Sequence, residues 1–286
     1  MSLTIKDLIQ VGERILKNAG IENAGHDAEA LLCFEIGFDK QKIFMNWVYQ
    51  VDDLRSEKYF DLVNRRAGGE PLQYITGEQY FMGHRFTVNP SVLIVRPETE
   101  LLAAMAIEYL KKNKHKRSVL DLCTGSGAIA VSIIKECPRI KITASDISAE
   151  AIIVAQKNAK ELGVSGRIDF IKSDVFSGIK TGMFGKKFDL IVTNPPYIRT
   201  GDLENLQREI KEHEPLIALD GGADGLDFYR RIAKEASVYL NKGACILTEI
   251  GYDQAEDVIS LFDDAGFKRA TVFQDLSGHD RIIRIE

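Results

Sequence analysis

From residue 118 onward, short apolar runs alternate with segments of helical pattern. Such alternation is typical of an α/β protein, in which helices cover both faces of a mostly parallel sheet. A short loop with a glycine separates the last two runs, which favours an antiparallel last strand. The runs predict seven strands, at residues 118–122, 140–145, 168–172, 188–193, 243–249, 268–273 and 281–285.

A glycine-rich turn follows the first of these strands. The segment Val119–Ala130 contains Gly-x-Gly-x-x-Ala, which fits a site for NAD or S-adenosylmethionine and also a purely structural turn. Asp121 favours S-adenosylmethionine, because a carboxylate there would repel a pyrophosphate and attract the ammonium and sulfonium groups. The turn residues expected to contact this cofactor are Cys123, Thr124, Gly125, Ser126 and Gly127.

Two further carboxylates follow neighbouring strands. Asp146 could accept both hydroxyls of a ribose, and it would also stabilise the N-terminus of the helix after it. Asp174 could accept the amino group of adenine while Val175 or Phe176 packs on the ring; a solvated loop carboxylate is the alternative. Both positions lie at the carboxyl ends of strands, where open α/β sheets bind ligands.

The segment Asn194-Pro195-Pro196-Tyr197 follows the strand at 188–193. Neither proline can donate a ladder hydrogen bond, so the strand must end there in a stiff loop. This loop offers an amide side chain, backbone carbonyls and an aromatic ring, a set that suits a planar NH2 group. We therefore expect it to hold a nitrogen nucleophile of amide or amidine type, with Asn194 also beside the cofactor.

The residues before the sheet have mostly helical patterns. Thr4 and Asp7 resemble a capping box that opens a helix to about residue 20, and helices are also expected at 27–37, after Asp39 and at 56–66. We expect Phe44 and Trp47 in the core of this bundle. The segment around Gly83 predicts a hairpin.

Three domains are expected from this organisation. They are a helical domain at residues 1–72, a hairpin linker at 73–95 and a catalytic domain at 96–286. Pro97 suits the first turn of a helix that runs to about Lys112.

Composition limits the function classes. The formal net charge is −5, and the first ninety residues hold 10 Lys or Arg against 13 Asp or Glu, which argues against stable nucleic-acid binding. The basic run 111–117 is interpreted as a solvated helix end, with an RNA or ribosome contact as the alternative. No apolar run could span a bilayer, the start is unlike a signal peptide, and the four cysteines and five histidines lack metal-site spacing. We expect a cytoplasmic monomer without a metal.

Taken together, these motifs resemble the PrmC (HemK) family of protein-glutamine N5-methyltransferases, which modify peptide chain release factors. The resemblance covers essentially the whole chain. Family proteins usually have a proline where Val95 stands and often an aromatic residue where Val175 stands. The matching segments are Pro71–Gly77, Arg96–Glu100, Asp121–Gly127, Asp146, Asn194–Tyr197 and the positions Glu214, Pro215, Ala218, Leu219, Gly222, Gly225, Leu226 and Tyr229.

The resemblance implies a class I S-adenosylmethionine-dependent methyltransferase with a Rossmann-like sheet and an N-terminal helical domain that docks the release factor. It implies that the target is the glutamine of a Gly-Gly-Gln motif, held by Asn194–Tyr197. Because an amide nitrogen is a poor nucleophile, we expect Asn194 Oδ1 and the Pro195 carbonyl to accept its hydrogens, while Tyr197 packs on the amide plane.

Other functions share parts of this pattern. A glutamine methyltransferase of a ribosomal protein has the same loop and reaction. An adenine-N6 methyltransferase of nucleic acid also has the loop, but it would need a basic region for its target. An NAD-dependent oxidoreductase or a non-catalytic binding module would not need Asp121, Asn194 and Tyr197 together.

Overall fold

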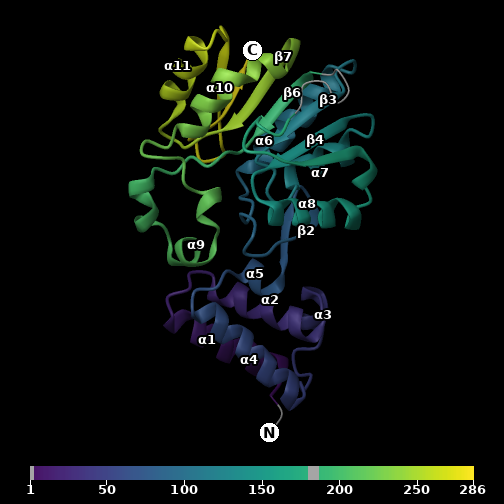
Figure 1. Ribbon diagram of the computed structural model, residues 1–286. Helices are drawn as coiled ribbons and strands as arrows, with labels where there is room; N and C mark the ends of the chain where they lie inside the picture. The colour runs from purple at the N-terminus through teal and green to yellow at the C-terminus, as the bar shows by residue number, and fades with distance from the viewer. Residues whose placement is uncertain (1–2, 180–186) are drawn as a thin grey trace. The chain divides into compact units, whose positions relative to one another are not determined.

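The computed structural model describes residues 3–179 and 187–286, which form two compact units (Figure 1). The first unit holds the described residues up to Glu78 and the segment Gln207–His213. The second holds the described residues of Gln79–Leu206 and Glu214–Glu286. A segment from far along the chain thus belongs to the amino-terminal unit, and the expected boundaries at residues 72 and 95 stay a prediction.

The first unit is a helical bundle, as predicted. The Thr4 hydroxyl accepts from the Asp7 amide at 3.2 Å and the Asp7 carboxylate accepts from the Thr4 amide at 3.1 Å, so the capping box is present. Two short helices, α5 and α9, were not predicted. The helices are α1 (Ile5–Asn18), α2 (Ala24–Ile36), α3 (Lys40–Met45), α4 (Asp53–Ala67), α5 (Leu72–Thr76) and α9 (Arg208–His213).

A buried arginine connects three helices of this unit. Arg66 on α4 donates from Nε to the Asp27 carboxylate on α2 at 2.7 Å, and from Nη1 to the Glu209 carboxylate on α9 at 2.6 Å. Arg66 is 8% exposed and Asp27 4%. Since buried charges are tolerated only when paired and hydrogen-bonded, this cluster fastens segment 207–213 to the bundle.

Phe44 departs from its expected place in the bundle core. It is 54% exposed, and its ring stacks on Trp47 with the centroids 5.6 Å apart. The helix α3 has six residues, and Ile43 is the one that it buries. Trp47 packs partly buried against the core. The prediction is therefore wrong for Phe44, because so short a helix directs few side chains inward.

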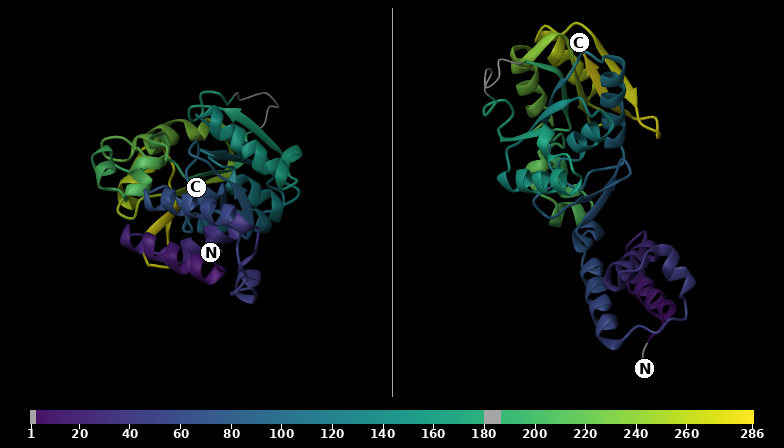
Figure 2. Two further views of the ribbon diagram at one scale, coloured as in Figure 1. Left: turned by 90° about the horizontal axis from the view of Figure 1, so that it is seen from below. Right: turned by 90° about the vertical axis from the view of Figure 1, so that its right-hand side faces the viewer.

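The second unit is built on a seven-stranded sheet of order β5-β4-β3-β6-β7-β9-β8 (Figures 1 and 2). The five strands from β5 to β7 pair in parallel, and β9 runs antiparallel to both β7 and β8. This confirms the predicted α/β class. The strands are β3 (Ser118–Leu122), β4 (Lys141–Asp146), β5 (Ile168–Lys172), β6 (Phe188–Thr193), β7 (Leu240–Glu249), β8 (Ala270–Gln274) and β9 (Asp280–Ile285).

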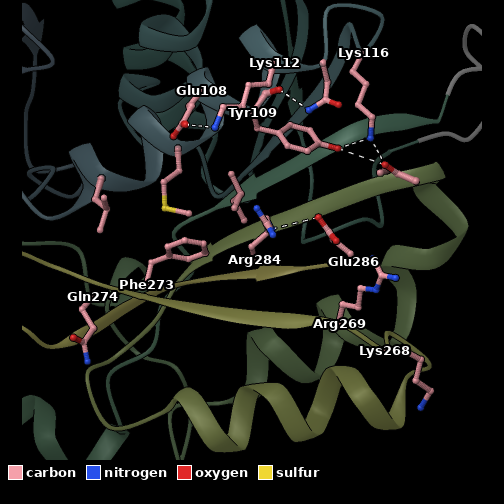
Figure 3. Close-up of a pocket in the computed structure, with 16 residues that line it drawn as sticks. Glu108, Tyr109, Lys112, Lys116, Lys268, Arg269, Phe273, Gln274, Arg284 and Glu286 are labelled. Atoms are coloured by element: carbon pink, nitrogen blue, oxygen red, sulfur yellow. Dashed lines mark hydrogen bonds and ion pairs between the residues drawn. The ribbon is translucent and has the colours of Figure 1, made fainter.

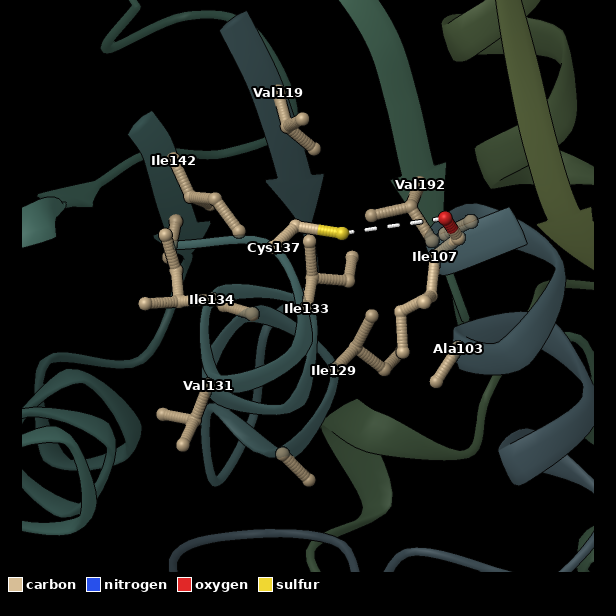
Figure 4. Packing of buried hydrophobic residues seen from close by; sticks show 14 of the residues in the cluster. Ala103, Ile107, Val119, Ile129, Val131, Ile133, Ile134, Cys137, Ile142 and Val192 are labelled. Carbon is tan, nitrogen blue, oxygen red and sulfur yellow. Dashed lines mark hydrogen bonds between the residues drawn. The ribbon is translucent and has the colours of Figure 1, made fainter. Parts of the chain in front are cut away.

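Helices cover both faces of the sheet. Along β6, Val192 packs in one hydrophobic cluster with Ile133 of α7, while Ile191 packs in another with Tyr229 of α10. Figure 4 shows the first cluster. Burial on both faces explains why β6 is apolar from Leu190 to Val192 without alternation. The covering helices are α6 (Thr99–Lys112), α7 (Ala128–Glu136), α8 (Ala149–Glu161), α10 (Asp227–Tyr239) and α11 (Ala255–Asp264).

The connecting segments also follow the sequence closely. The predicted hairpin is β1 (Glu78–Phe81) and β2 (His84–Thr87), with Met82 and Gly83 at φ of 49° and 73° in its turn. Pro97 lies one residue before the N-cap of α6, slightly outside the expected first turn. Short 3-10 helices occur at Ser165–Arg167, Thr200–Asn205 and Leu216–Ala218. Among the described helices, none has the length and apolarity needed to cross a membrane.

Candidate active site

The loop Asn194–Tyr197 leaves the carboxyl end of β6, as predicted. Pro195 and Pro196 are buried, while Asn194 is half-buried and donates from Nδ2 to Thr99 Oγ1 at 3.3 Å. Thr99 is the first residue of α6 and is 1% exposed. The amide of Asn194 is therefore tied to a buried hydroxyl on a neighbouring helix.

Glycines allow the chain to pack directly against this loop. A Cβ built on Gly221 would lie 2.8 Å from Tyr197 Cα and 2.9 Å from the Pro196 carbonyl oxygen. Gly225 has a φ of +78° and lies against the Tyr197 carbonyl, which also accepts from Gln254 Nε2 at 2.9 Å. The loop is thus held by backbone contacts that leave no room for side chains at residues 221 and 225.

A buried carboxylate lies beneath the same loop. Glu249 ends β7 with 1% exposure, and its Oε1 accepts from the Tyr197 hydroxyl at 3.4 Å. Its Oε2 has no hydrogen-bond partner among the described residues. Burial raises the pKa of Glu249 to about 7, and the neighbouring Thr99 hydroxyl and the charge of Arg281 act in the opposite direction. Nothing in the spacing of the sequence signalled this residue.

Three residues of the glycine turn after β3 have a left-handed backbone, which is uncommon for the non-glycine Cys123. Cys123, Gly125 and Gly127 have φ values of 60°, 53° and 78°. Asp146 Oδ2 accepts from the Gly125 amide at 2.9 Å, and Oδ1 accepts from the Ser148 amide at 3.0 Å. The Asp146 carboxylate thereby connects the turns at the ends of β3 and β4.

Asp121 lies behind this turn and is fully buried. Its Oδ2 accepts from Thr124 Oγ1 at 2.6 Å, while Oδ1 has no partner among the described residues. Burial, with a smaller contribution from Asp146, raises the pKa of Asp121 to about 7. A buried acceptor without a donor beside a second carboxylate is favourable for a cationic ligand, so these residues fit the sulfonium and ammonium groups of S-adenosylmethionine.

A cavity in the second unit brings most of the predicted site residues together. The predicted residues on its wall are Cys123, Gly125, Asp146, Asp174, Val175, Asn194 and Pro196. Those not on the wall are Asp121, Thr124, Ser126, Gly127, Pro195 and Tyr197. The remaining wall residues, which sequence reasoning did not assign to the site, are Ser91, Val92, Leu93, Ser145, Ile147, Ser148, Ala151, Ser173, Pro215, Ile217, Ala218 and Phe228.

The two residues considered for an adenine ring differ in position. Val175, with a φ of 49°, lines the cavity. Phe176 is 1% exposed and stacks on Tyr239 with the centroids 4.4 Å apart, so it belongs to the core. Placing Phe176 on the ring was therefore the wrong alternative. Asp174 forms an ion pair with Arg231 at 2.7 Å.

Arg96 and Glu214 form an ion pair in which the Glu214 carboxylate is buried and bonded within the protein. Arg96 Nη2 donates to Glu214 Oε1 at 2.6 Å, and the Ile94 amide donates to Glu214 Oε2 at 3.3 Å. The Glu214 side chain is 1% exposed. Because Pro215 follows on the cavity wall, this pair holds that part of the wall against the segment before α6.

A second hollow, of about 950 Å3, lies along α6, β7, β8 and β9 (Figure 3). No predicted site residue lines it. It contains part of the basic run: Lys112 pairs with Glu108, whereas Lys116 is 9% exposed and donates to the Tyr109 hydroxyl and the Gly243 carbonyl. The interpretation of this run as solvated is therefore wrong for Lys116.

Comparisons with known proteins identify the family. Residues 7–77 match the PrmC N-terminal domain, and residues 98–216 match the methyltransferase small domain. The release factor glutamine methyltransferase of Geobacter sulfurreducens is 41% identical over 280 residues, which cover 98% of this chain and 95% of that protein. The chain belongs to the release factor glutamine methyltransferase family. A protein of the same name from Clostridium acetobutylicum is 37% identical over 281 residues, with 98% of both chains covered.

Solved structures of low identity share the fold of this family member. The catalytic domain of hMettl16, in complex with an RNA hairpin, is 14% identical with a TM-score of 0.54 and covers 82% of each chain. A ribosomal protein L11 methylase from Lactobacillus delbrueckii is 20% identical with a TM-score of 0.50, covering 70% of this chain and 83% of that one. Both support the class I methyltransferase fold.

Proposed function

We propose that this protein transfers a methyl group from S-adenosylmethionine to the side-chain nitrogen N5 of the glutamine in the Gly-Gly-Gln motif of peptide chain release factors. The observation that carries the proposal is one cavity with Asp146 and Gly125 on its wall beside Asn194 and Pro196. A nucleoside-binding turn and an amide-binding loop thus border the same space, as methyl transfer to an amide requires.

Several residues would hold the methyl donor. Asp146 would accept the ribose hydroxyls with the lone pairs that its two backbone hydrogen bonds leave free. Asp121 would attract the cationic end, and Asp174 and Val175 would contact the adenine. The turn residues Cys123, Thr124, Gly125, Ser126 and Gly127 would form the backbone cradle, with Asn194 beside it. S-adenosylmethionine supplies the activated methyl group, and the protein supplies orientation and electrostatics.

The chain's own contribution to the reaction centres on the substrate amide. Its nitrogen lone pair is delocalised into the carbonyl, so positioning must replace deprotonation before attack. Asn194 Oδ1 and the Pro195 carbonyl would accept the two N–H hydrogens, which aims the nitrogen and stabilises the positive charge that develops on it. Pro196 and Tyr197 would exclude water from the reacting atoms, and the Tyr197 ring is itself partly buried in the core.

The proposed organisation follows from the same substrate. The helical domain at 1–72 would dock the release factor, the segment 73–95 would link it, and residues 96–286 would carry out catalysis. The partner would be a protein that acts in translation termination in the cytoplasm. The net charge of −5 argues against stable nucleic-acid binding, and we propose that the enzyme acts as a monomer.

Labelled S-adenosylmethionine tests this function. Incubation with a release factor should label the wild-type substrate and leave a variant with Gln→Ala in its Gly-Gly-Gln motif unlabelled. Label that survives the substitution would refute the assigned target, and label on neither substrate would refute the activity.

A further inference from the structure

The amide of Asn194 has two possible orientations, and only one serves the proposed reaction. If its carbonyl oxygen faces the cavity, it can accept a hydrogen of the substrate amide. If its NH2 group faces the cavity, it offers only donors to a substrate NH2 group. Something in the structure must therefore select the first orientation.

The selecting contact is the hydrogen bond from Asn194 Nδ2 to Thr99 Oγ1, at 3.3 Å. A hydroxyl has one hydrogen and two lone pairs, so it can accept from Asn194 while it donates elsewhere. Thr99 is 1% exposed, which removes water as a competing partner. The orientation of Asn194 thus depends on where the Thr99 hydrogen goes.

The Thr99 hydroxyl also interacts with the Glu249 carboxylate, where it favours the ionised form. Glu249 Oε1 accepts from the Tyr197 hydroxyl at 3.4 Å, and the Glu249 backbone carbonyl accepts from the Tyr229 hydroxyl at 2.9 Å. The charges that act on this carboxylate are those of Arg281 and Glu98. The buried Glu249 carboxylate therefore accepts from Tyr197 of the loop and has the Thr99 hydroxyl as a neighbour.

An ionised carboxylate can only accept hydrogen bonds. Thr99 must then donate to Glu249 and accept from Asn194, which leaves Asn194 Oδ1 free for another partner. With the amide reversed, Asn194 Oδ1 would face a hydroxyl whose single hydrogen is already used. While Glu249 is ionised, Asn194 therefore donates to Thr99 and Thr99 donates to Glu249, and neither bond can be reversed.

We infer that Thr99 and Glu249 are positioning residues that fix the amide of Asn194 with its carbonyl oxygen toward the cavity. This inference rests on the proposed function, in which that oxygen accepts a hydrogen of the substrate glutamine. Neither residue lines the cavity, so both act through Asn194 and, for Glu249, through Tyr197.

Because the orientation of the Asn194 amide depends on the charge of Glu249, it should depend on pH. Burial raises the pKa of this carboxyl to about 7, so acidification adds a hydrogen that the carboxyl can donate to Thr99. Thr99 can then accept from Glu249 and donate to Asn194, so both orientations of the Asn194 amide become possible. We expect kcat of the wild type to fall as the pH decreases below about 7.

Variants at residue 99 separate positioning from packing. Thr99→Val keeps the shape and removes the hydroxyl; it should lower kcat about tenfold or more, with KM for the release factor and Kd for S-adenosylmethionine changed less than about threefold. Thr99→Ser should restore most of kcat. Thr248→Val, at another buried threonine next to Glu249, is the matched control and should leave kcat unchanged.

A variant at residue 249 gives a second, independent readout. Glu249→Gln should lower kcat at pH 8 and abolish its dependence on pH around 7, because the uncharged amide cannot impose one direction. The pH profile of Glu249→Gln tests the positioning role even if Thr99→Val does not fold.

Asn194→Ala separates failure of this inference from failure of the proposed function. Wild-type kcat in Thr99→Val together with an unchanged pH profile in Glu249→Gln would overturn the inference, while a loss of kcat in Asn194→Ala would leave the proposed function standing. Wild-type kcat in Asn194→Ala would overturn both.

Discussion

Gly221 lies against the backbone of Tyr197 so closely that a Cβ built on it would be 2.8 Å from Tyr197 Cα. Neither atom is at the end of a flexible side chain, so Gly221→Ala must displace the loop. We expect a loss of about 2 kcal/mol in the free energy of unfolding, measured by denaturant titration. Gly201→Ala is the control, because a Cβ there meets nothing within 4 Å. Equal stability of the two variants would contradict the packing argument.

The ribose role of Asp146 predicts a selective loss of cofactor affinity. Asp146→Asn replaces a charged acceptor of two hydroxyl hydrogen bonds, so Kd for S-adenosylmethionine should rise about tenfold or more in calorimetry. The exposed Asp169 of the neighbouring strand β5 provides the control, Asp169→Asn. An unchanged Kd in Asp146→Asn would remove this residue from the cofactor site.

The buried pair of Arg66 and Asp27 predicts a large effect in the helical unit. Arg66→Met leaves the Asp27 carboxylate buried without its guanidinium and should cost about 3–5 kcal/mol in the free energy of unfolding. The matched variant Arg65→Met removes a pair with Glu70 in which the arginine side chain is 46% exposed, and should cost about 1 kcal/mol at most. If thermal unfolding shows similar losses of stability in the two variants, burial does not determine how much an ion pair contributes to the free energy of unfolding.

Asp121 predicts a pH dependence of stability with a definite sign. Its pKa rises from 3.8 to about 7 on folding, so the native state binds more protons than the unfolded state between these values. Its contribution to the free energy of unfolding is fully present below pH 3.8 and is lost as the pH rises to about 7. Asp121→Asn should reduce this decrease in the free energy of unfolding by a few kcal/mol, because a pKa change of this size corresponds to a free energy of that order. Unfolding curves of the two proteins that stay parallel from pH 4 to 8 would contradict this.

The strands and the site loops follow from sequence because their signals are local. The strands β3, β5 and β6 have the predicted bounds, since each is a mostly apolar segment next to turn or loop residues. The helices α5 and α9 have five and six residues, too few for an apolar period to become visible.

Contacts between residues that lie far apart in the chain could not be predicted from the sequence. Arg66 contacts Glu209, which is 143 residues away, and nothing near either residue indicates the pair. The same holds for Glu249 under Tyr197, and for Ser91, Val92 and Leu93 on the cavity wall. Phe176 was ambiguous because Val175 and Phe176 are adjacent, and only packing decides which one enters the core.

In the proposed reaction, Asn194 is the residue that positions the substrate amide. Asn194→Ala should lower kcat for methylation of a release factor about 100-fold or more, because the acceptor acts on charge that develops in the transition state. The affinity for S-adenosylmethionine, measured by calorimetry on the same preparation, should change less than about threefold. Equal losses in kcat and in cofactor affinity would contradict this role and assign Asn194 to cofactor binding alone.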